Sequence, residues 1–327
     1  MSGTKPTAPH GAGPAPAGGG AQDAAPGRSR APGRRRSARS TAGALLRATR
    51  PKQWLKNLLV FAAPGTAGLL TEPRALAWSA AAFVLFCAAS SGTYLLNDVR
   101  DAARDRLHER KRHRPVAAGR LSPAVAAGAG AVLLLAAAAS GAATGNWPLL
   151  AVLAGYLVLT TAYTLVLKNV VVLDLVAVAG CHVLRAVAGG AAIGVPLTRW
   201  FLIVVCLGAL LVVTGKREAE LRTPGAARTR DALGRYSLSY LAQVRTMASA
   251  AMIVTYCLWA LDGPAATTAA VVHGMSIVPF ILVVLRYHLL VDRGVGEEPE
   301  EIALGDRPLQ LSGAALLALI GLGVYLE

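Results

Sequence analysis

Acidic side chains cluster directly after a long apolar run in the first third of the chain. If the apolar helix continues into this stretch, Asn97, Asp101 and Asp105 follow one another at steps of four residues and share one face. Amide and carboxylate oxygens suit Mg²⁺, which takes one or two protein carboxylates and completes its shell with water and phosphate oxygens. The spacing therefore predicts a magnesium site made of these three residues, with Asp98 beside them.

Basic side chains follow the acidic cluster at once, and they could bind the phosphate oxygens that a metal ion leaves free. They are Arg110, Lys111, Arg112 and Arg114. The alternative is a solvated loop with interleaved ion pairs. Because the acidic cluster begins at a predicted membrane boundary, where an unpaired carboxylate is costly, metal–diphosphate binding is favoured.

Three further ionisable residues lie inside an apolar run: Asp174, His182 and Arg185. On one helix Asp174 and Arg185 would be separated by about 16 Å along the axis, too far to pair. Arg185 is therefore predicted to bind an anionic ligand, and the alternative is an ion pair with another helix. His182 is predicted to be a hydrogen-bonded core residue.

The composition excludes a soluble protein. Of 327 residues, 54% are apolar and only 16% are charged, and the runs 123–142 and 147–167 carry no charge over about a bilayer thickness. The net charge of +15 is explained by basic residues between membrane spans, without nucleic acid. All four cysteines fall in apolar stretches without paired spacing, which favours free, structural thiols.

The first 40 residues contain no Val, Ile, Leu, Phe, Tyr or Trp. Such a segment cannot bury enough apolar surface to fold. The sequence therefore predicts a disordered basic tail over 1–44, whose arginines could lie on anionic lipid headgroups, and a catalytic membrane domain over 45–327.

Hydropathy predicts an all-α membrane protein, because backbone groups in lipid must be bonded within each segment and no alternating strand pattern is present. Nine spans are expected, at about 54–70, 76–96, 123–142, 147–167, 170–192, 199–215, 243–262, 267–289 and 310–326. In that arrangement every Lys and Arg except Arg74, Arg199 and Arg185 lies on one side of the membrane. The positive-inside rule then places the N-terminus in the cytoplasm and the C-terminus outside, with the long connections facing the cytoplasm.

Several motifs resemble a known family. The pattern N-D-x-x-D-x-x-x-D-R from Asn97, followed by K-R-x-R-P-x-A-x-G, is similar to the first aspartate-rich motif of the UbiA-type intramembrane prenyltransferase superfamily. Five longer stretches resemble one branch of that superfamily, which transfers a phosphoribosyl group to a polyprenyl phosphate. They are R-P-K-Q-W-L-K-N at 50–57, Y-L-L-N-D-V-R-D at 94–101, V-L-R-A-V-A-G-G at 183–190, G-K-R-E-A-E-L at 215–221 and E-P-E-E-I-A-L-G-D-R at 298–307.

The resemblance implies a nine-helix bundle in the plasma membrane with a cytoplasmic, Mg²⁺-dependent active site. It implies transfer of 5-phosphoribosyl from phosphoribosyl diphosphate to a polyprenyl (decaprenyl) phosphate, for the synthesis of arabinofuranose-containing cell-envelope glycans. A homo-oligomer is left open. Carried over by position, Mg²⁺ would be held by Asn97, Asp101 and Asp105, the donor would be contacted by Lys56, Tyr94 and Lys111, and Lys168 and Arg185 would face donor or lipid phosphates.

Two other functions remain open. A prenyltransferase using a prenyl diphosphate donor and an aromatic acceptor would share the metal–diphosphate site. Prenyl-transferring members of the superfamily carry a second aspartate-rich motif after the sixth span, whereas this chain has Lys216, Arg217, Glu218 and Glu220 there. A transporter would need inverted repeats or helices broken at midplane, and no convincing internal repeat is present.

Overall fold

The structure is a computed structural model that describes residues 38–109, 111–223, 232–262, 267–295 and 298–326. Every regular element within these ranges is helical, which confirms the predicted all-α class. Most of the predicted basic tail, residues 1–37, lies outside the described residues.

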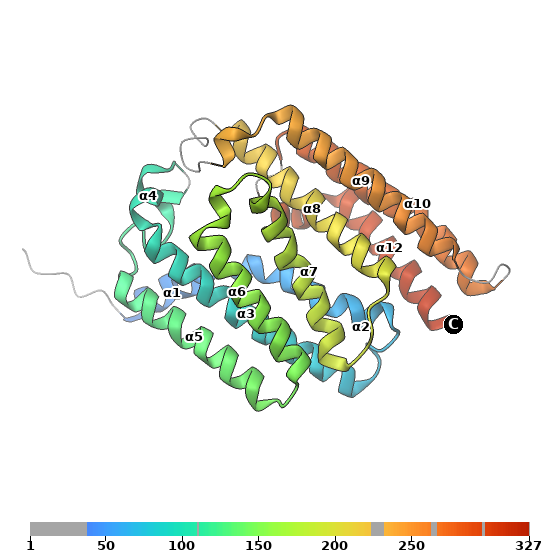
Figure 1. Cartoon of the computed structure of the whole chain (residues 1–327), viewed down its shortest axis with the longest axis horizontal. Helices are drawn as coiled ribbons and strands as arrows, with labels where there is room; N and C mark the ends of the chain where they lie inside the picture. The colour runs from blue at the N-terminus through green and yellow to red at the C-terminus, as the bar shows by residue number, and fades with distance from the viewer. Residues whose placement is uncertain (1–37, 110, 224–231, 263–266, 296–297, 327) are drawn as a thin grey trace, which may run out of the picture. The chain divides into compact units, whose positions relative to one another are not determined.

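Eight of the described helices are long and apolar enough to cross a membrane. They are α3 (Pro73–Arg100), α5 (Pro123–Ala143), α6 (Trp147–Leu165), α7 (Leu173–Ile193), α8 (Arg199–Arg222), α9 (Leu238–Leu261), α10 (Thr268–Asp292) and α12 (Arg307–Leu326). They confirm eight of the nine predicted spans. Figure 1 shows them running alongside one another, from green α5 and α6 through yellow α8 to orange α10.

Local sequence explains where these helices begin. Side-chain oxygens of Ser122, Asn146 and Thr198 each accept a hydrogen bond from a backbone N–H in the first turn of α5, α6 and α8. Ser237 and Thr267 do the same for α9 and α10. Such caps satisfy backbone donors that have no partner within the helix, so the helix starts follow from residues next to them in the sequence.

The segment predicted as the first span differs from the other eight. It forms a 3₁₀ helix, η1 (Pro51–Phe61), followed by the short helix α2 (Ala62–Thr66). At rises of about 2.0 and 1.5 Å per residue, the two together extend roughly 30 Å, close to the thickness of a bilayer core.

This segment also passes from one end of the bundle to the other. Arg50, just before η1, pairs with Asp98 near the end of α3. Gly68, just after α2, lies against the C-terminal end of α12 (Arg307–Leu326), at the other end of the bundle (Figure 1). A Cβ atom on Gly68 would come within 3.2 Å of Val324 there. The segment has the length and direction of a membrane crossing, and the count of nine crossings remains a prediction.

Close contact with α7 accounts for the narrow 3₁₀ geometry. A Cβ atom on Gly189 of α7 would lie 1.9 Å from the carbonyl oxygen of Val60 in η1, which no real side chain tolerates. Because a 3₁₀ helix is narrower than an α-helix, it brings its backbone against a glycine without displacing its neighbours. Val60 and Asn57 are fully buried as a result.

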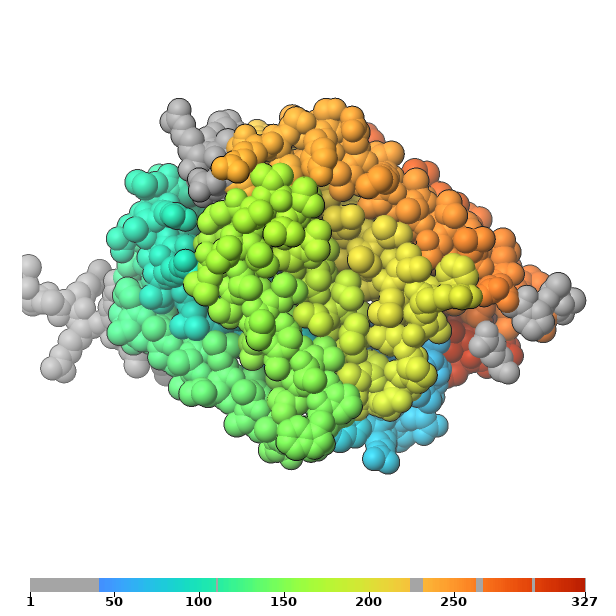
Figure 2. Space-filling view, viewed as in Figure 1, coloured from blue at the N-terminus to red at the C-terminus, as the bar shows by residue number. Residues whose placement is uncertain are grey.

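The helices divide into inner and outer ones. In their most apolar stretches, 56% of the residues of α3 and of α7 are buried, against 6% for α12. Figure 2 shows a face formed mostly by the green, yellow and orange segments, while the blue segment containing η1 and α2 is visible only at an edge. The exposed apolar side chains of the outer helices suit contact with lipid, and all four cysteines are free thiols, as predicted.

One end of the bundle carries most of the polar connections, and we call it the polar end. Here α3, α6, α8 and α10 finish, and the short elements lie between the long helices. These elements are α4 (Ala102–Leu107), η2 (Lys111–His113), η3 (Leu167–Asn169), η5 (Leu233–Arg235) and α11 (Pro299–Gly305). The first helix, α1 (Ala38–Ala48), begins within the predicted tail 1–44, and its Ala44 and Ala48 are buried against α3.

The contact between η1 and α7 predicts the effect of adding one methyl group. We expect Gly189→Ala to lower stability by about 1–3 kcal/mol, because the new Cβ forces η1 away from α7. Gly155→Ala in α6 is the matched control, since nothing lies within 4 Å of a Cβ there. That variant should be neutral or stabilising, as alanine usually is in a helix. Thermal unfolding in detergent compares the two, and equal midpoints would contradict the proposed close contact.

Candidate functional site

A cavity of about 440 Å³ lies at the polar end of the bundle. Side chains from nearly every connection at this end line it. Seven of the eight predicted binding and metal-ligating residues are among them: Lys56, Tyr94, Asn97, Asp101, Asp105, Lys111 and Lys168. The fold therefore gathers into one cavity residues that lie far apart in the sequence.

The lining of the cavity is strongly basic. Eight arginines and lysines line it, against four acidic residues. The basic residues are Arg50, Lys56, Arg104, Lys111, Arg114, Lys168, Lys216 and Arg217, and the acidic ones are Asp101, Asp105, Glu220 and Glu298. Part of the wall is apolar, where Val178, Val212 and Val213 face the cavity. This combination suits an anion with several charges that is joined to an apolar group.

The three predicted metal ligands share one face, as their spacing predicts. The backbone N–H of Asp101 donates to the carbonyl of Asn97 at 2.8 Å, and the N–H of Asp105 donates to the carbonyl of Asp101 at 2.9 Å. Asp101 ends α3 and begins α4, so the helical repeat continues through the junction between the two helices. All three side chains line the cavity.

Basic side chains neutralise the buried carboxylates beside this face. Asp98, only 1% exposed, pairs with Arg50 at 2.5 Å and with Arg114 at 3.4 Å. Arg114 also reaches Asp105 at 2.7 Å. Asp98 was predicted to lie beside the metal ligands and support them, but it is not part of the lining, and its ion pairs instead hold the surrounding loops.

Asp101 is the most accessible carboxylate of the group. Its side chain is 27% exposed, and Lys168 approaches it at 3.4 Å. Among the described residues, no group of three or more His, Cys, Asp or Glu side chains is placed to hold a metal ion. Because Mg²⁺ needs only one or two protein carboxylates when phosphate oxygens complete its shell, Asp101 with Asn97 and Asp105 fits that ion as a partial site.

The connection from α6 to α7 carries Lys168 and a strained backbone. Val172, just before α7, has a φ of 69°, which is unfavourable for a β-branched residue. Its N–H donates to the hydroxyl of Tyr236 at 2.6 Å, and that hydroxyl donates to Asp174. Arg50 is the other described non-glycine residue with positive φ, and it lines the cavity. Strain of this kind concentrates at functional sites.

Arg217 joins the connection to α8. Its Nε donates to Asp174 at 2.8 Å, and its two terminal nitrogens donate to Glu220 at 2.8 Å and to the hydroxyl of Tyr163 at 2.9 Å. The prediction that Asp174 does not pair with Arg185 is therefore correct, and its partner comes from another helix. Tyr163, Arg217 and Glu220 all line the cavity.

The structure does not bring Arg185 to the cavity, contrary to its predicted contact with phosphate. Arg185 is 3% exposed, and its nitrogens donate to Asn57 at 2.7 Å, to the carbonyl of Cys181 at 2.7 Å and to the hydroxyl of Tyr156 at 3.0 Å. The guanidinium also lies over the ring of Tyr156. In the described part of the chain it has neutral acceptors, so the predicted alternative of an ion pair is not seen either.

His182 lies one turn from this arginine, and its prediction as a hydrogen-bonded core residue is confirmed for the hydrogen bond only, since the side chain is half-buried. Its Nδ1 is 2.8 Å from the carbonyl of Val178, so it is a hydrogen-bonded residue. The imidazole also lines the cavity, which the sequence did not predict.

Lys216 is a cavity residue that was not predicted as a ligand. The sixth span was expected to end at residue 215, but α8 continues to Arg222 and so carries Lys216 and Glu220 on the face that lines the cavity. Among the described residues Lys216 makes no hydrogen bond or ion pair. The G-K-R-E-A-E-L stretch was a signal for it, since its charges follow an apolar helix without a helix-breaking residue.

The other side of the cavity is closed by η1 and α11. Lys56 pairs with Glu300, and Lys52 pairs with Glu301 at 3.0 Å. Glu298, just before α11, lines the cavity. The E-P-E-E stretch therefore has a structural role, because it ties the C-terminal part of the chain to η1.

Known protein sequences are similar to this chain over nearly all of its length. The profile of the UbiA prenyltransferase family matches residues 58–304. The chain is 40% identical to decaprenyl-phosphate phosphoribosyltransferase of Corynebacterium glutamicum over 299 residues, which is 90% of each chain. It is also 40% identical to the protein of that name from Mycobacterium tuberculosis, covering 86% of this chain and 94% of the relative.

Solved structures show the same fold. A UbiA homologue from Archaeoglobus fulgidus bound to DMAPP and Mg²⁺ superimposes with a TM-score of 0.66 at 18% identity, covering 86% of this chain and 99% of that one. The same homologue bound to GPP and Mg²⁺ gives a TM-score of 0.64. At this level of identity the likeness establishes the fold of the bundle.

The contacts of Arg185 predict a structural role that can be measured. We expect Arg185→Gln to lower stability by at least about 2 kcal/mol, because hydrogen bonds of a buried charged group contribute roughly 1.5–3 kcal/mol each. The apparent affinity of the surviving folded protein for its substrates should stay unchanged. Arg199→Gln, at an exposed arginine at the other end of the bundle, is the control and should unfold at the wild-type temperature. Normal stability of Arg185→Gln combined with weaker substrate binding would show that Arg185 contacts a substrate phosphate after all.

Proposed function

The chain belongs to the UbiA prenyltransferase family, and from this premise we propose that it transfers a 5-phosphoribosyl group from phosphoribosyl diphosphate to a polyprenyl phosphate such as decaprenyl phosphate. The observation that carries the proposal is the 40% identity, over 90% of each chain, to a relative named decaprenyl-phosphate phosphoribosyltransferase. The match covers nearly the whole length, so it spans the segments that line the cavity as well as the long helices.

The charges of the cavity support a donor with several phosphates. Phosphoribosyl diphosphate carries a monophosphate and a diphosphate on one sugar, and the lining has twice as many basic as acidic residues. In this proposal Lys56, Tyr94 and Lys111 contact the donor. Lys216 joins them, because among the described residues this cavity lysine has no hydrogen-bond or ion-pair partner and so can bind a phosphate oxygen.

Mg²⁺ is proposed as the resident metal ion, held by Asn97, Asp101 and Asp105. When bound, it would neutralise the negative charge that builds up on the departing diphosphate. Asp101 is accessible enough to reach a ligand, while Asp105 is oriented by Arg114. Lys168 now approaches Asp101, and a phosphate group near that carboxylate would give the lysine a second anionic partner.

The reaction needs positioning more than acid–base catalysis. A phosphate oxygen of the lipid forms the new bond to the anomeric carbon of the ribose, and the bond from that carbon to the diphosphate breaks. The acceptor is already an anion, so no side chain must remove a proton from it. The protein contributes by placing the two phosphates, and we assign the lipid phosphate to Lys168 because this lysine lies where α6 ends at the membrane boundary.

The alternative donor, a prenyl diphosphate, has less support from α8. Glu218 is 1% exposed and pairs with arginines away from the cavity, so Glu220 is the carboxylate that this part of α8 offers the cavity. Glu220 is itself paired with Arg217. A second acidic metal-binding face is therefore missing from the described part of α8, as the sequence predicts.

The orientation in the membrane is part of the proposal. The connections at the polar end contain nearly all the basic residues of the membrane domain, so the positive-inside rule places this end in the cytoplasm. A water-soluble sugar diphosphate would then enter from the cytoplasm, and the lipid phosphate would arrive from the inner leaflet of the plasma membrane.

The donor is tested directly with purified protein, Mg²⁺ and decaprenyl phosphate. We expect label from phosphoribosyl diphosphate to pass into the lipid fraction. Labelled prenyl diphosphate offered with an aromatic acceptor should give no product, since the described part of α8 offers the cavity no second acidic face. Transfer from the prenyl donor with none from the sugar donor would overturn the proposal.

The metal site is tested by a change that keeps side-chain volume. We expect Asp101→Asn to retain less than a tenth of wild-type phosphoribosyl transfer, a loss of at least about 1.4 kcal/mol in transition-state stabilisation, because the amide weakens the hold on Mg²⁺. Asp262→Asn makes the same chemical change at the other end of the bundle and should be fully active. Full wild-type activity in a chelator, or normal turnover by Asp101→Asn, would show the metal assignment to be wrong.

A further inference from the structure

The polar end of α8 has two faces with different partners. Val212, Val213, Lys216, Arg217 and Glu220 line the cavity, and their spacing of three and four residues puts them on one side of the helix. Gly215, Glu218 and Arg222 repeat at three and four residues on the other side, towards α9 and α10. Anything that fixes the second face therefore fixes the direction of the first.

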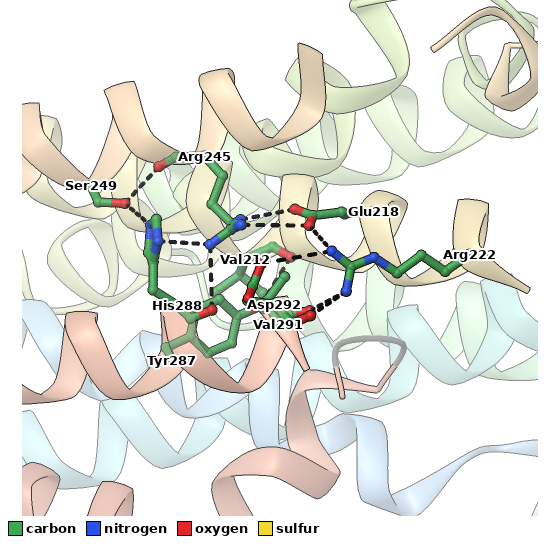
Figure 3. Close-up of polar contacts among 9 residues, drawn as sticks. All are labelled: Val212, Glu218, Arg222, Arg245, Ser249, Tyr287, His288, Val291 and Asp292. Atoms are coloured by element: carbon green, nitrogen blue, oxygen red, sulfur yellow. Dashed lines mark hydrogen bonds and ion pairs between the residues drawn. The ribbon is translucent and has the colours of Figure 1, made fainter. Parts of the chain in front are cut away.

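A closed set of hydrogen bonds holds the second face (Figure 3). Glu218 accepts from Nε of Arg245 in α9 at 2.9 Å, and a terminal nitrogen of Arg245 lies 2.7 Å from Nδ1 of His288 in α10. Nε2 of His288 lies 2.5 Å from the hydroxyl of Ser249, which donates to the backbone carbonyl of Arg245 at 2.6 Å. We call Glu218, Arg245, Ser249 and His288 the α8 anchor.

The donors and acceptors of the α8 anchor fit one arrangement. Because the arginine can only donate, Nδ1 of His288 must accept, and its proton is then on Nε2, which donates to Ser249. Each hydrogen bond of the set then joins one donor to one acceptor. The four residues of the anchor therefore satisfy one another by these hydrogen bonds.

Close contacts between α8 and α10 also fix the position of α8 along its axis. A Cβ atom on Gly215 would come within 2.9 Å of Val291 and 3.0 Å of the hydroxyl of Tyr287, so the two helices touch at this level. Tyr287 donates to the carbonyl of Val212 at 3.3 Å, and Arg222 donates to the carbonyl of Val291 at 3.2 Å (Figure 3). α8 can neither slide nor rotate here without breaking several of these contacts.

Stability alone is a weak reason for such an arrangement. Glu218 is 1% exposed and Arg245 is 5% exposed, and a buried ion pair often stabilises a fold no better than apolar residues of similar size. What a buried pair does supply is a single allowed position for the two elements that carry it. The residue before Glu218 is Arg217 and the one before that is Lys216, both in the cavity.

We propose that the α8 anchor is a set of positioning residues for the phosphate-binding face of α8, acting on the donor through Lys216 and Arg217. The inference rests on the proposed function, since it takes the group bound there to be the diphosphate of the donor. Glu218 itself does not touch the substrate in this proposal. Its loss changes where Lys216 points, so it weakens donor binding more than it slows the chemical step.

The decisive experiment is a double-mutant cycle between Glu218→Gln and Lys216→Gln, with KM for phosphoribosyl diphosphate and kcat measured for each protein. We expect each single change to raise KM by about tenfold with kcat altered much less, as for lost ground-state binding. The KM of the double variant should rise by clearly less than the product of the two single rises, because Glu218 acts largely through that lysine and Arg217 carries the rest. Independent, multiplicative effects on KM would overturn the proposal.

The control breaks another arginine–carboxylate ion pair at the polar end, between Arg286 of α10 and Asp306, the residue before α12. Arg286 donates to Asp306 at 3.0 and 2.8 Å, and this guanidinium holds the pKa of the Asp306 carboxyl below its usual range. Neither residue lines the cavity. Asp306→Asn should leave KM and kcat at wild-type values. If Glu218→Gln likewise lowers only the unfolding temperature, the anchor is merely structural and the proposal is wrong.

Two further measurements keep the proposal falsifiable. Should Glu218→Gln fail to fold, Ser249→Ala opens the ring by one hydroxyl and is expected to raise KM by about threefold, with unchanged KM counting against the proposal. Binding of inorganic diphosphate with Mg²⁺, measured without turnover, separates the two hypotheses. Wild-type protein that binds diphosphate but transfers no phosphoribosyl group would refute the proposed function alone, whereas unweakened binding by Glu218→Gln would refute the anchor.

Discussion

The burial of one carboxylate determines how the cavity is assembled. Asp98 lies at the end of an apolar helix with 1% of its side chain exposed, and a charge in that position must meet an opposite charge. Arg50 reaches it from the segment before η1, and Arg114 reaches it from the loop after η2. Three stretches that are separate in the sequence therefore meet at one point, and Lys56 and Lys111 are carried to the cavity on two of them.

The same rule governs the other charged groups at this end of the bundle. Asp174 meets Arg217, Glu218 meets Arg245, and Arg114 is shared with Asp105. Each pair joins different elements, so the compensation of charge is also the means by which the polar end is held together. Lys216 has no hydrogen-bond or ion-pair partner among the described residues, and it adds to the excess of basic over acidic side chains that line the cavity.

Features that depend on neighbouring residues could be predicted from the sequence. Eight long helices follow from apolar runs that carry few charges or none, and five of them begin at a Ser, Thr or Asn cap. The shared face of Asn97, Asp101 and Asp105 follows from a spacing of four residues, which needs only that the helical repeat continues. The resemblance to a known family added the residues of the cavity that no local pattern reveals, such as Lys56 and Tyr94.

Features that depend on distant partners could not be predicted in this way. Arg185 was expected to bind phosphate because the one carboxylate of its own helix, Asp174, is too far along the axis to reach it, yet Asn57 and Tyr156 satisfy it from other elements. The burial of Glu218 in α8 depends on Arg245 of α9, which lowers the cost of burying that carboxylate. The 3₁₀ form of η1 depends on a glycine of α7 that lies more than a hundred residues away in the sequence.

The apolar wall of the cavity bears on the fidelity of the reaction. An activated anomeric carbon is open to attack by water, which is far more concentrated than any lipid phosphate in a membrane. Val178, Val212 and Val213 offer water no hydrogen bond on this part of the lining, so they hold water less firmly than the charged wall does. A lipid acceptor suffers no such disadvantage because it brings its own apolar chain. In the proposed reaction the three valines would therefore favour transfer over wasteful hydrolysis, a ratio that the charged residues do not control.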